Sequence, residues 1–228
     1  MIVIDNISFT YRAQERVLKN VSLKIPFGDF VAIIGPNGSG KSTFAKILAG
    51  ILKPKEGSLL YNSQTIEKFS SKIGYVPQRA QVDSQFPATV KELLETQQVG
   101  KGTITCSKLG VSQLLEKQFS KLSGGQQQKV LIELALQKNP SVLILDEPVS
   151  GVDIASQKEF YALLKHLHEH HKLTIFFVTH DLGMIPKSTK HILHFTNQSC
   201  VYAPITDAQK IIKKMFQGFD LVQTELKK

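Results

Sequence analysis

The chain has 228 residues, of which 42% are hydrophobic and 21% charged, a balance typical of a folded globular protein and not of a disordered one. No apolar run approaches the roughly 18 residues that cross a bilayer. The longest runs are strand-sized: Val31–Ile34, Val142–Leu145 and Leu173–Val178. The N-terminus lacks a basic region followed by an apolar stretch, so we expect no signal peptide. Cys106 and Cys200 lie far apart without metal-ligand spacing, which favours a reducing cytoplasm.

The net charge of +9 would suit nucleic acid, an anionic membrane surface or an acidic partner. The lysines are scattered, however, and form only short pairs such as Lys213–Lys214 and Lys227–Lys228. Neither a long basic run nor an RNA-reading aromatic motif occurs in the sequence. The charge therefore indicates a solvated basic surface, and we expect no nucleic-acid partner.

The first part of the chain predicts strands that lead into a glycine-rich loop. Short strands are expected at Ile2–Ile4 and Ile7–Tyr11, and strand character continues over Val17–Ile25. Phe30–Ile34 is a continuous apolar run, typical of a buried strand, and Thr43–Leu52 has apolar residues on one helical face. A buried strand, a glycine loop and a helix together begin an α/β unit.

The middle of the chain differs, because Gln78–Lys121 contains no buried-strand run. Helices are predicted at Thr89–Val99 and Ser112–Phe119, so we expect a mostly helical subdomain inserted into the α/β core. The predicted layout is a single domain over 1–228, with a core lobe of residues 1–78 and 123–228 and an insertion of residues 79–122.

The core pattern returns after residue 123. Helices are predicted at Gln126–Gln137 and Ala155–His168, and buried strands at Val142–Leu145 and Thr174–Val178. A capping-box pattern, Thr206-x-x-Gln209, predicts a C-terminal helical tail over residues 205–228.

Residues 35 to 43 fit the phosphate-binding pattern G-x-x-x-x-G-K-[ST]. Glycines let backbone N–H groups converge on phosphate oxygens, and the start of the following helix adds its positive end. Lys41 would reach the β- and γ-phosphates of ATP, and Ser42 would bind Mg²⁺. The expected ATP-binding residues of this loop are Gly35, Pro36, Asn37, Gly38, Ser39, Gly40, Lys41, Ser42 and Thr43.

Two adjacent carboxylates, Asp146 and Glu147, follow the buried strand Val142–Leu145. Ligands of α/β proteins bind at the C-terminal ends of such strands. Asp146 suits the Mg²⁺ shell, and Glu147 suits a general base that polarises the attacking water. An isolated Asp-Glu pair could equally be a solvated loop, but beside a phosphate loop it indicates an ATP hydrolase.

A third motif opens the helix after residue 123. Its residues could present N–H groups to an anion, or could be a simple helix cap with flexible glycines. The candidate residues are Ser123, Gly124, Gly125 and Gln126.

In order, these motifs resemble those of ATP-binding cassette (ABC) ATPases, and the resemblance covers about residues 2 to 194. The sequence Leu122–Gln126 resembles the family's signature motif. Tyr11 resembles the aromatic residue that stacks on adenine, and Gln78 the glutamine that contacts Mg²⁺ and senses the transport partner. Asp153 resembles the D-loop aspartate, and His180 the switch histidine that holds the γ-phosphate.

Each of these residues has a structural alternative when taken singly. Tyr11 could be a surface aromatic residue of a strand, Gln78 a turn residue, and His180 a helix cap. The ordered set favours the functional interpretation. Two departures from the family pattern are mild: Gly151-Val152 precedes Asp153 where Ala-Leu is usual, and an arginine usually present near Lys129 is missing. We therefore expect an active ATPase.

The resemblance implies an α/β P-loop NTPase fold of the ABC ATPase type, with a mixed sheet core, an inserted helical subdomain and an N-terminal antiparallel β region. It also implies a homodimer, in which ATP bound at Lys41 of one chain is completed by Ser123 and Gly125 of the other. Because the sequence shows no membrane span, we expect the pore to be a separate permease that docks beside Gln78–Thr89. The chain is then expected at the cytoplasmic face of the membrane, acting indirectly with an extracellular metal-binding protein.

The substrate is inferred from resemblance alone. Phe86–Val90 resembles the corresponding stretch of zinc and manganese importers. Glu159–Tyr161, together with the histidines at positions 166, 168, 170 and 171, resembles zinc-uptake cassettes of Gram-positive bacteria. Zinc is the expected ion. Manganese, an iron chelate or another small solute stays an alternative, as does a soluble ABC ATPase acting on nucleic acid or ribosomes.

Four histidines lie close together in the sequence: His166, His168, His170 and His171. His166 and His170 are one helical turn apart, the spacing of two zinc ligands on a helix. The alternative interpretation is a solvated helix end.

Overall fold

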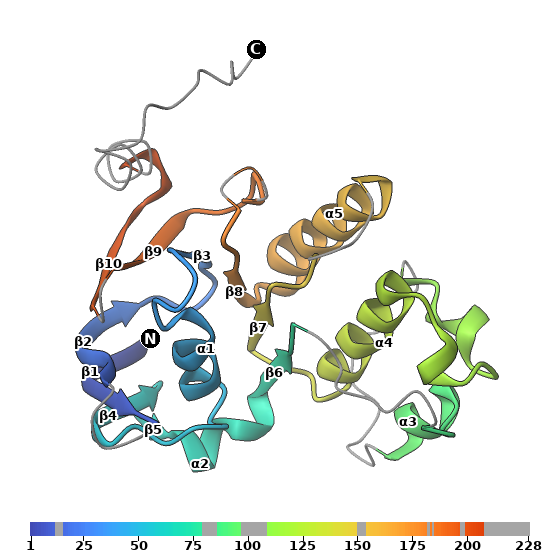
Figure 1. Cartoon of the computed structure of the whole chain (residues 1–228), viewed down its shortest axis with the longest axis horizontal. Helices are drawn as coiled ribbons and strands as arrows, with labels where there is room; N and C mark the ends of the chain where they lie inside the picture. Colours follow the sequence, from blue (N-terminus) through green and yellow to red (C-terminus); the bar gives the residue numbers. More distant parts are fainter. Residues whose placement is uncertain are drawn as a thin grey trace.

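The computed structural model describes residues 1–11, 16–78, 86–96, 109–149, 154–181, 183, 185–196 and 199–207 (Figure 1). Two sheets with helices between and beside them make up these residues. No helix within these ranges is both long enough and apolar enough to span a membrane.

The N-terminal sheet is antiparallel and has the strand order β2-β1-β4-β5. Its strands are β1 (Ile2–Thr10), β2 (Arg16–Ile25), β4 (Glu56–Tyr61) and β5 (Gln64–Thr65). The two short strands expected before Tyr11 form the single strand β1. A shift in pairing between Ile4 and Ile7 interrupts it, and Asn6 there has a φ of 51°. The polar pair Asp5-Asn6 therefore marks a bulge and not a break.

The second sheet is mixed, with the order β10-β9-β3-β8-β7-β6. Its strands are β3 (Phe30–Ile34), β6 (Ile73–Val76), β7 (Val142–Asp146), β8 (Thr174–Val178), β9 (His191–Thr196) and β10 (Ser199–Pro204). The five strands from β9 to β6 are parallel, and β10 pairs antiparallel with β9. Every residue of β3, β7 and β8 is buried, as their continuous apolar sequences predict.

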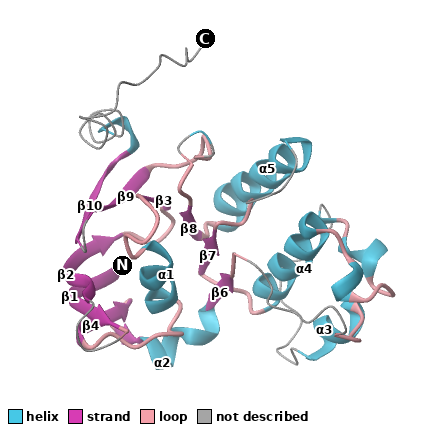
Figure 2. Ribbon diagram, viewed as in Figure 1, coloured by secondary structure: helices cyan, strands magenta, loops and turns pink. Residues whose placement is uncertain are grey.

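Alternate residues of the central strands feed two separate cores. Val142 and Ile144 of β7 pack with Phe44 of helix α1 (Lys41–Leu48), in the layer between the two sheets. Leu143 and Leu145 point to the opposite face, into a core shared with the remaining long helices. Those helices are α3 (Val90–Thr96), α4 (Gly124–Gln137) and α5 (Ile154–His171), drawn in cyan beside β6, β7 and β8 in Figure 2.

The predicted helix at Ser112–Phe119 is wrong. Two short 3-10 turns, Val111–Leu114 and Phe119–Lys121, occupy this stretch. The backbone between them pairs with the segment before α3 instead of continuing a helix: Thr89 forms a bridge with Gln118, and the N–H of Phe119 donates to the carbonyl of Ala88. These tertiary bonds satisfy groups that a helix would have bonded internally.

The other predicted elements agree with the structure to within a few residues, except where they leave the described ranges. The end of the helix expected at Thr89–Val99 lies outside them, as does the part of the predicted C-terminal helical tail that follows the 3-10 turn Ile205–Asp207. Short helical turns also occur at α2 (Ile66–Phe69) and Ser70–Lys72. The division of the domain at residues 78 and 123 stays a prediction.

Gly57, in β4 opposite the bulge of β1, should be among the glycines least tolerant of substitution. Its φ is 85°, and a Cβ there would lie 2.4 Å from the carbonyl oxygens of Asp5 and Asn6. We expect Gly57→Ala to lower the free energy of unfolding, measured by urea denaturation, by about 2–3 kcal/mol. Gly110→Ala is the matched control, because Gly110 has a φ of 64° and no described atom lies within 4 Å of the point that a Cβ would occupy. It should lose only about 1 kcal/mol, and equal losses would contradict the bulge argument.

Candidate active site

The phosphate-loop sequence joins the end of β3 to the start of α1 and needs glycine at two positions. Gly35 has a φ of 147°, and a Cβ on it would lie 2.6 Å from the carbonyl oxygen of Phe195. Gly40 has a φ of 99°, and a Cβ there would lie 2.9 Å from a methyl carbon of Leu18. At Gly35 and Gly40 the loop therefore packs too closely against its neighbours, and in too unusual a backbone conformation, for a residue with a side chain. It ends at the N-terminus of α1, whose first N–H groups lack partners within the helix.

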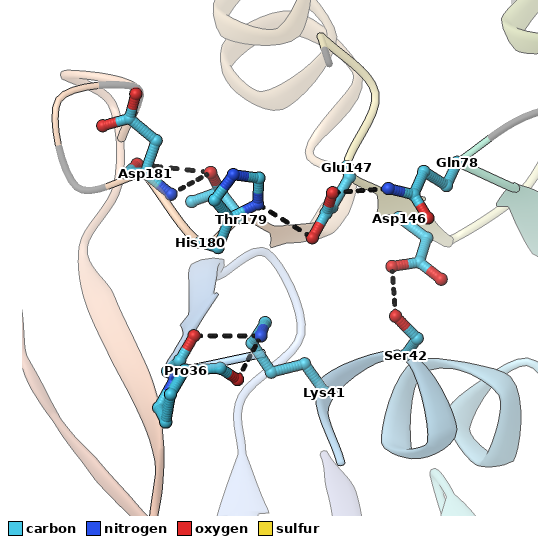
Figure 3. Close-up of polar contacts among 10 residues, drawn as sticks. Pro36, Lys41, Ser42, Gln78, Asp146, Glu147, Thr179, His180 and Asp181 are labelled. Atoms are coloured by element: carbon cyan, nitrogen blue, oxygen red, sulfur yellow. Dashed lines mark hydrogen bonds and ion pairs between the residues drawn. The ribbon is translucent and has the colours of Figure 1, made fainter. Parts of the chain in front are cut away.

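Lys41 is buried and lies beneath this loop (Figure 3). Its ammonium group donates to the carbonyl oxygens of Gly35 at 2.9 Å and Pro36 at 2.8 Å. Burial lowers the pKa of Lys41, while the nearby carboxylates of Glu147 and Asp146 act in the opposite direction. The hydroxyl oxygen of Ser39 is also buried and has no hydrogen-bond partner among the described residues. A cation and an unpaired hydroxyl in one glycine-rich loop fit an anionic ligand such as a phosphate group.

Asp146 ends β7, and its side chain meets the phosphate loop. Its Oδ1 accepts a hydrogen bond from the hydroxyl of Ser42 at 3.0 Å, and its Oδ2 accepts one from the hydroxyl of Tyr75 at 3.2 Å. Burial raises the pKa of the Asp146 carboxyl, and these two hydrogen bonds oppose that rise. The structure thus brings together Ser42 and Asp146, two of the expected Mg²⁺ ligands. Their hydroxyl and carboxylate oxygens are the donor types that Mg²⁺ prefers.

Glu147 is clamped between two side chains that the sequence predicted to act with it. Gln78 donates through Nε2 to Oε2 at 2.6 Å, and the Nδ1 of His180 lies 3.0 Å from Oε1 (Figure 3). Glu147 has a φ of 47°, which is unusual for a residue other than glycine. The N–H of Glu147 donates to the carbonyl of Val178 at 3.1 Å, which holds this turn in place. Backbone strain of this kind concentrates at functional sites.

Gln78 therefore contacts the expected general base, and its expected contact with Mg²⁺ stays a prediction. The loop that carries His180 is held by its own polar groups. The hydroxyl of Thr179 accepts from the N–H of Asp181 at 3.0 Å and donates to the carbonyl of Asp181 at 3.2 Å. This local turn fixes the direction of the loop next to Glu147.

A cavity of about 310 Å³ lies over the phosphate loop. Its described lining residues are Tyr11, Val17, Asn37, Gly38, Gly40, Lys41, Ser42, Thr43 and Glu147. The Tyr11 hydroxyl forms a hydrogen bond of 3.1 Å with the hydroxyl of Thr43, while 56% of the residue stays exposed. Phe9 supports the ring edge-on, with 5.0 Å between ring centroids. Tyr11 is thus held at the cavity with area free to stack against a flat ligand.

The Ser-Gly-Gly motif lies elsewhere on the molecule. Ser123 caps α4, and its side chain and that of Gln126 bond reciprocally to each other's backbone N–H groups. Ser123 and Gly124 are exposed, and none of the described residues that line the cavity belongs to this motif. Figure 1 shows α4 on the far side of β6 from α1. Within one chain the motif is a helix cap, and its predicted contact with nucleotide stays a prediction.

Sequence reasoning missed Tyr75 as a partner of Asp146. The strand β6 that carries it was not predicted, because its four residues include Gly74 and form no long apolar run. The aromatic residue three positions before Gln78 was the available signal. Asp153, by contrast, was predicted as a site residue and lies outside the described residues.

The four histidines near the end of α5 do not share one environment. His168 is buried, and its Nδ1 lies 3.1 Å from the carbonyl oxygen of Leu173. The rings of His166 and His170 lie together, with 4.5 Å between centroids. No group of three or more metal-binding side chains occurs within the described part of the chain. His168 thus has a structural contact, and zinc binding by the other histidines stays untested.

Comparisons with known proteins match this geometry. A family model described as "ABC transporter" matches residues 18–150. The chain is 35% identical to the "Probable metal transport system ATP-binding protein" of Thermotoga maritima, over 97% of this chain and 93% of that protein. It is 36% identical to the "Zinc uptake system ATP-binding protein ZurA" of Listeria innocua, over 85% of this chain and 81% of that protein.

A solved structure is similar over most of the chain. The ATP-binding cassette MJ0796, described as dimeric in a post-hydrolysis state bound to ADP and Pi, superposes with a TM-score of 0.75. The identity is 28%, over 90% of this chain and 99% of that chain. The expected fold class, with a mixed core sheet and an antiparallel N-terminal sheet, is confirmed.

Proposed function

The chain belongs to the ABC transporter family and is an ATP-hydrolysing transport ATPase, and from this premise we propose that it is the ATP-binding subunit of a bacterial importer that takes up zinc. The observation that carries the enzymatic part is the placement of Glu147. It lies between Gln78 and His180 and lines the same cavity as Lys41. A carboxylate fixed beside a phosphate-binding loop can accept a proton from the water that attacks a phosphate.

The proposed mechanism divides the work among these residues. Loop N–H groups and Lys41 hold the β- and γ-phosphates, and Tyr11 stacks on the adenine. Glu147 orients the attacking water and accepts its proton, while His180 keeps the γ-phosphate in place. The bond from Gln78 to Glu147 ties this base to the segment that leads toward the inserted helices.

Mg²⁺ belongs to this proposal because the donor set fits it. Ser42 and Asp146 would hold the ion, and their side chains already lie in hydrogen-bond contact with each other. When bound, Mg²⁺ offsets the negative charge of the β- and γ-phosphates. Gln78 is the third proposed ligand.

A second copy of the chain would complete the site. The cap at Ser123 and Gly125, of which Ser123 is exposed and Gly125 partly exposed, lies away from the cavity of its own chain, so it would meet the nucleotide of a partner copy. A two-fold dimer would place each motif of one copy against the phosphate loop of the other and form two equivalent sites. The dimeric description of the similar cassette supports this arrangement. Asp153, predicted to act at the nucleotide site, lies outside the described residues.

The assignments of the transport partner and of the transported ion are based on the similar proteins. Relatives with the names of a metal transport system and a zinc uptake system cover most of the chain. We propose that the chain binds a membrane permease from the cytoplasmic face, through the inserted helical region near Thr89. An extracellular metal-binding protein would deliver zinc to the permease without contacting the cassette.

The general-base role predicts the behaviour of Glu147→Gln. The amide keeps the size of the side chain but cannot accept the proton, so we expect ATP turnover, measured as phosphate release, to fall about 100-fold or more. ATP binding, measured by equilibrium fluorescence with an ATP analogue, should stay within about twofold. Glu56→Gln, a change at an exposed residue of β4, should leave both values unaltered. Near-normal ATP turnover in Glu147→Gln would contradict the role of Glu147 as the general base.

The zinc assignment predicts a growth defect. A strain that lacks this gene and any second zinc importer should fail to grow when zinc is chelated, and zinc addition or the intact gene should restore growth. A Lys41→Ala copy should not restore it, because uptake would require nucleotide binding at the loop. If the deletion strain grew normally with zinc chelated but failed to grow under manganese limitation, the transported ion would be manganese and not zinc.

A further inference from the structure

Tyr75 contacts the acidic end of β7 from the neighbouring strand. It lies on β6, where it is paired with Ile144 of β7, two residues before Asp146. The half-buried ring packs against the core around α1, and the hydroxyl reaches along β7 to Oδ2 of Asp146 at 3.2 Å. A phenylalanine ring would pack against this core equally well, so packing does not account for the hydroxyl.

The two oxygens of Asp146 are held by hydroxyls from two different elements. Ser42, at the start of α1, donates to Oδ1 at 3.0 Å, and Tyr75 donates to Oδ2. Ser42 is also a proposed Mg²⁺ ligand, so its hydroxyl would serve the ion as well as Asp146. Tyr75 bonds the other oxygen and can keep its contact throughout. Of the two hydroxyls that hold the carboxylate, that of Tyr75 is therefore the one that is not itself a proposed Mg²⁺ ligand.

We propose that Tyr75 is a positioning residue of the Mg²⁺–nucleotide site, whose hydroxyl holds the Asp146 carboxylate with Oδ1 turned toward Ser42 and the phosphate loop. This inference rests on the proposed ATPase function and deepens it. Side chains that orient a metal-binding carboxylate contribute to metal affinity without touching the ion. Tyr75 is not among the described residues that line the cavity over the phosphate loop.

The same strand end reaches both carboxylates of the site. Three residues after Tyr75, Gln78 donates to Glu147 at 2.6 Å. Tyr75 thus bonds Asp146, and Gln78 bonds the adjacent Glu147. A displacement of the C-terminal end of β6 would therefore disturb the metal-holding carboxylate together with the general base.

Tyr75→Phe removes only the hydroxyl and tests the proposal. The measurement is binding of a fluorescent ATP analogue to the full chain, with Mg²⁺ titrated from zero, and with EDTA as the metal-free reference. We expect the Mg²⁺ concentration that gives half of the metal-dependent gain in affinity to rise about tenfold. Affinity in EDTA and the thermal unfolding midpoint should stay close to those of the unaltered protein.

Tyr202→Phe is the matched control. The hydroxyl of Tyr202 also donates to a buried carboxylate, that of Asp29, which precedes β3 at the end opposite to the phosphate loop. This variant should leave the Mg²⁺ dependence unaltered.

Three results would overturn the inference. One is an unshifted Mg²⁺ dependence in Tyr75→Phe, and another is an equal shift in Tyr202→Phe. The third is a loss of affinity in EDTA that matches the loss with Mg²⁺, since it would assign Tyr75 to the shape of the site and not to the metal. If the unaltered protein bound no nucleotide, the proposed function would fail and the inference with it, an outcome distinct from the other three.

Discussion

Parallel pairing of the central strands is the constraint on which the site depends. Because β3, β8, β7 and β6 run in the same direction, their C-terminal ends meet at one edge of the sheet. The phosphate loop follows β3, Glu147 follows β7, His180 follows β8, and Gln78 follows β6. Residues more than a hundred positions apart in the sequence thereby come within hydrogen-bond distance. Full burial of β3, β7 and β8 keeps these ends in fixed register.

Charge at this edge is arranged for a ligand that brings negative charge of its own. Lys41 is bonded to two loop carbonyls, while Asp146 and Glu147 are bonded to neutral hydroxyl and amide groups and to His180. The site thus holds two carboxylates and one buried ammonium group. A divalent cation bound with the nucleotide would balance the phosphates against these carboxylates.

Much of the fold could be predicted from the sequence where burial is uniform. Phe30–Ile34 and Thr174–Val178 were predicted with correct bounds, because strands buried on both faces are continuous apolar runs. The strands β4, β6, β9 and β10 were missed. They are short or carry polar residues, such as His191 and His194 in β9. The strands β4, β6 and β9 form through pairing with strands distant in the sequence, and β10 pairs with β9. The same cause explains the wrong helix at Ser112–Phe119, where pairing with Ala88 and Thr89 replaces helical bonds.

The residues of the candidate site were easier to predict than their contacts. Motif spacing predicted Lys41, Ser42 and Glu147 as members of one site, because a phosphate loop and an acidic strand end have characteristic local sequences. All three line the same cavity. The contact of Tyr75 with Asp146 and the positive φ of Glu147 depend on neighbouring strands, and no local pattern predicts them.

The central claim is that a second copy of the chain completes each nucleotide site, and light scattering on the Glu147→Gln protein tests it most directly. With ATP and Mg²⁺ the molar mass should double, because the slow variant retains the nucleotide that joins the two copies. Ser123→Arg added to this variant should abolish the doubling while the monomer still binds ATP. Ser112→Arg, the same change at an exposed residue of the same region, should not. Loss of ATP binding by the Ser123→Arg monomer, or a dimer that persists despite it, would contradict the shared site.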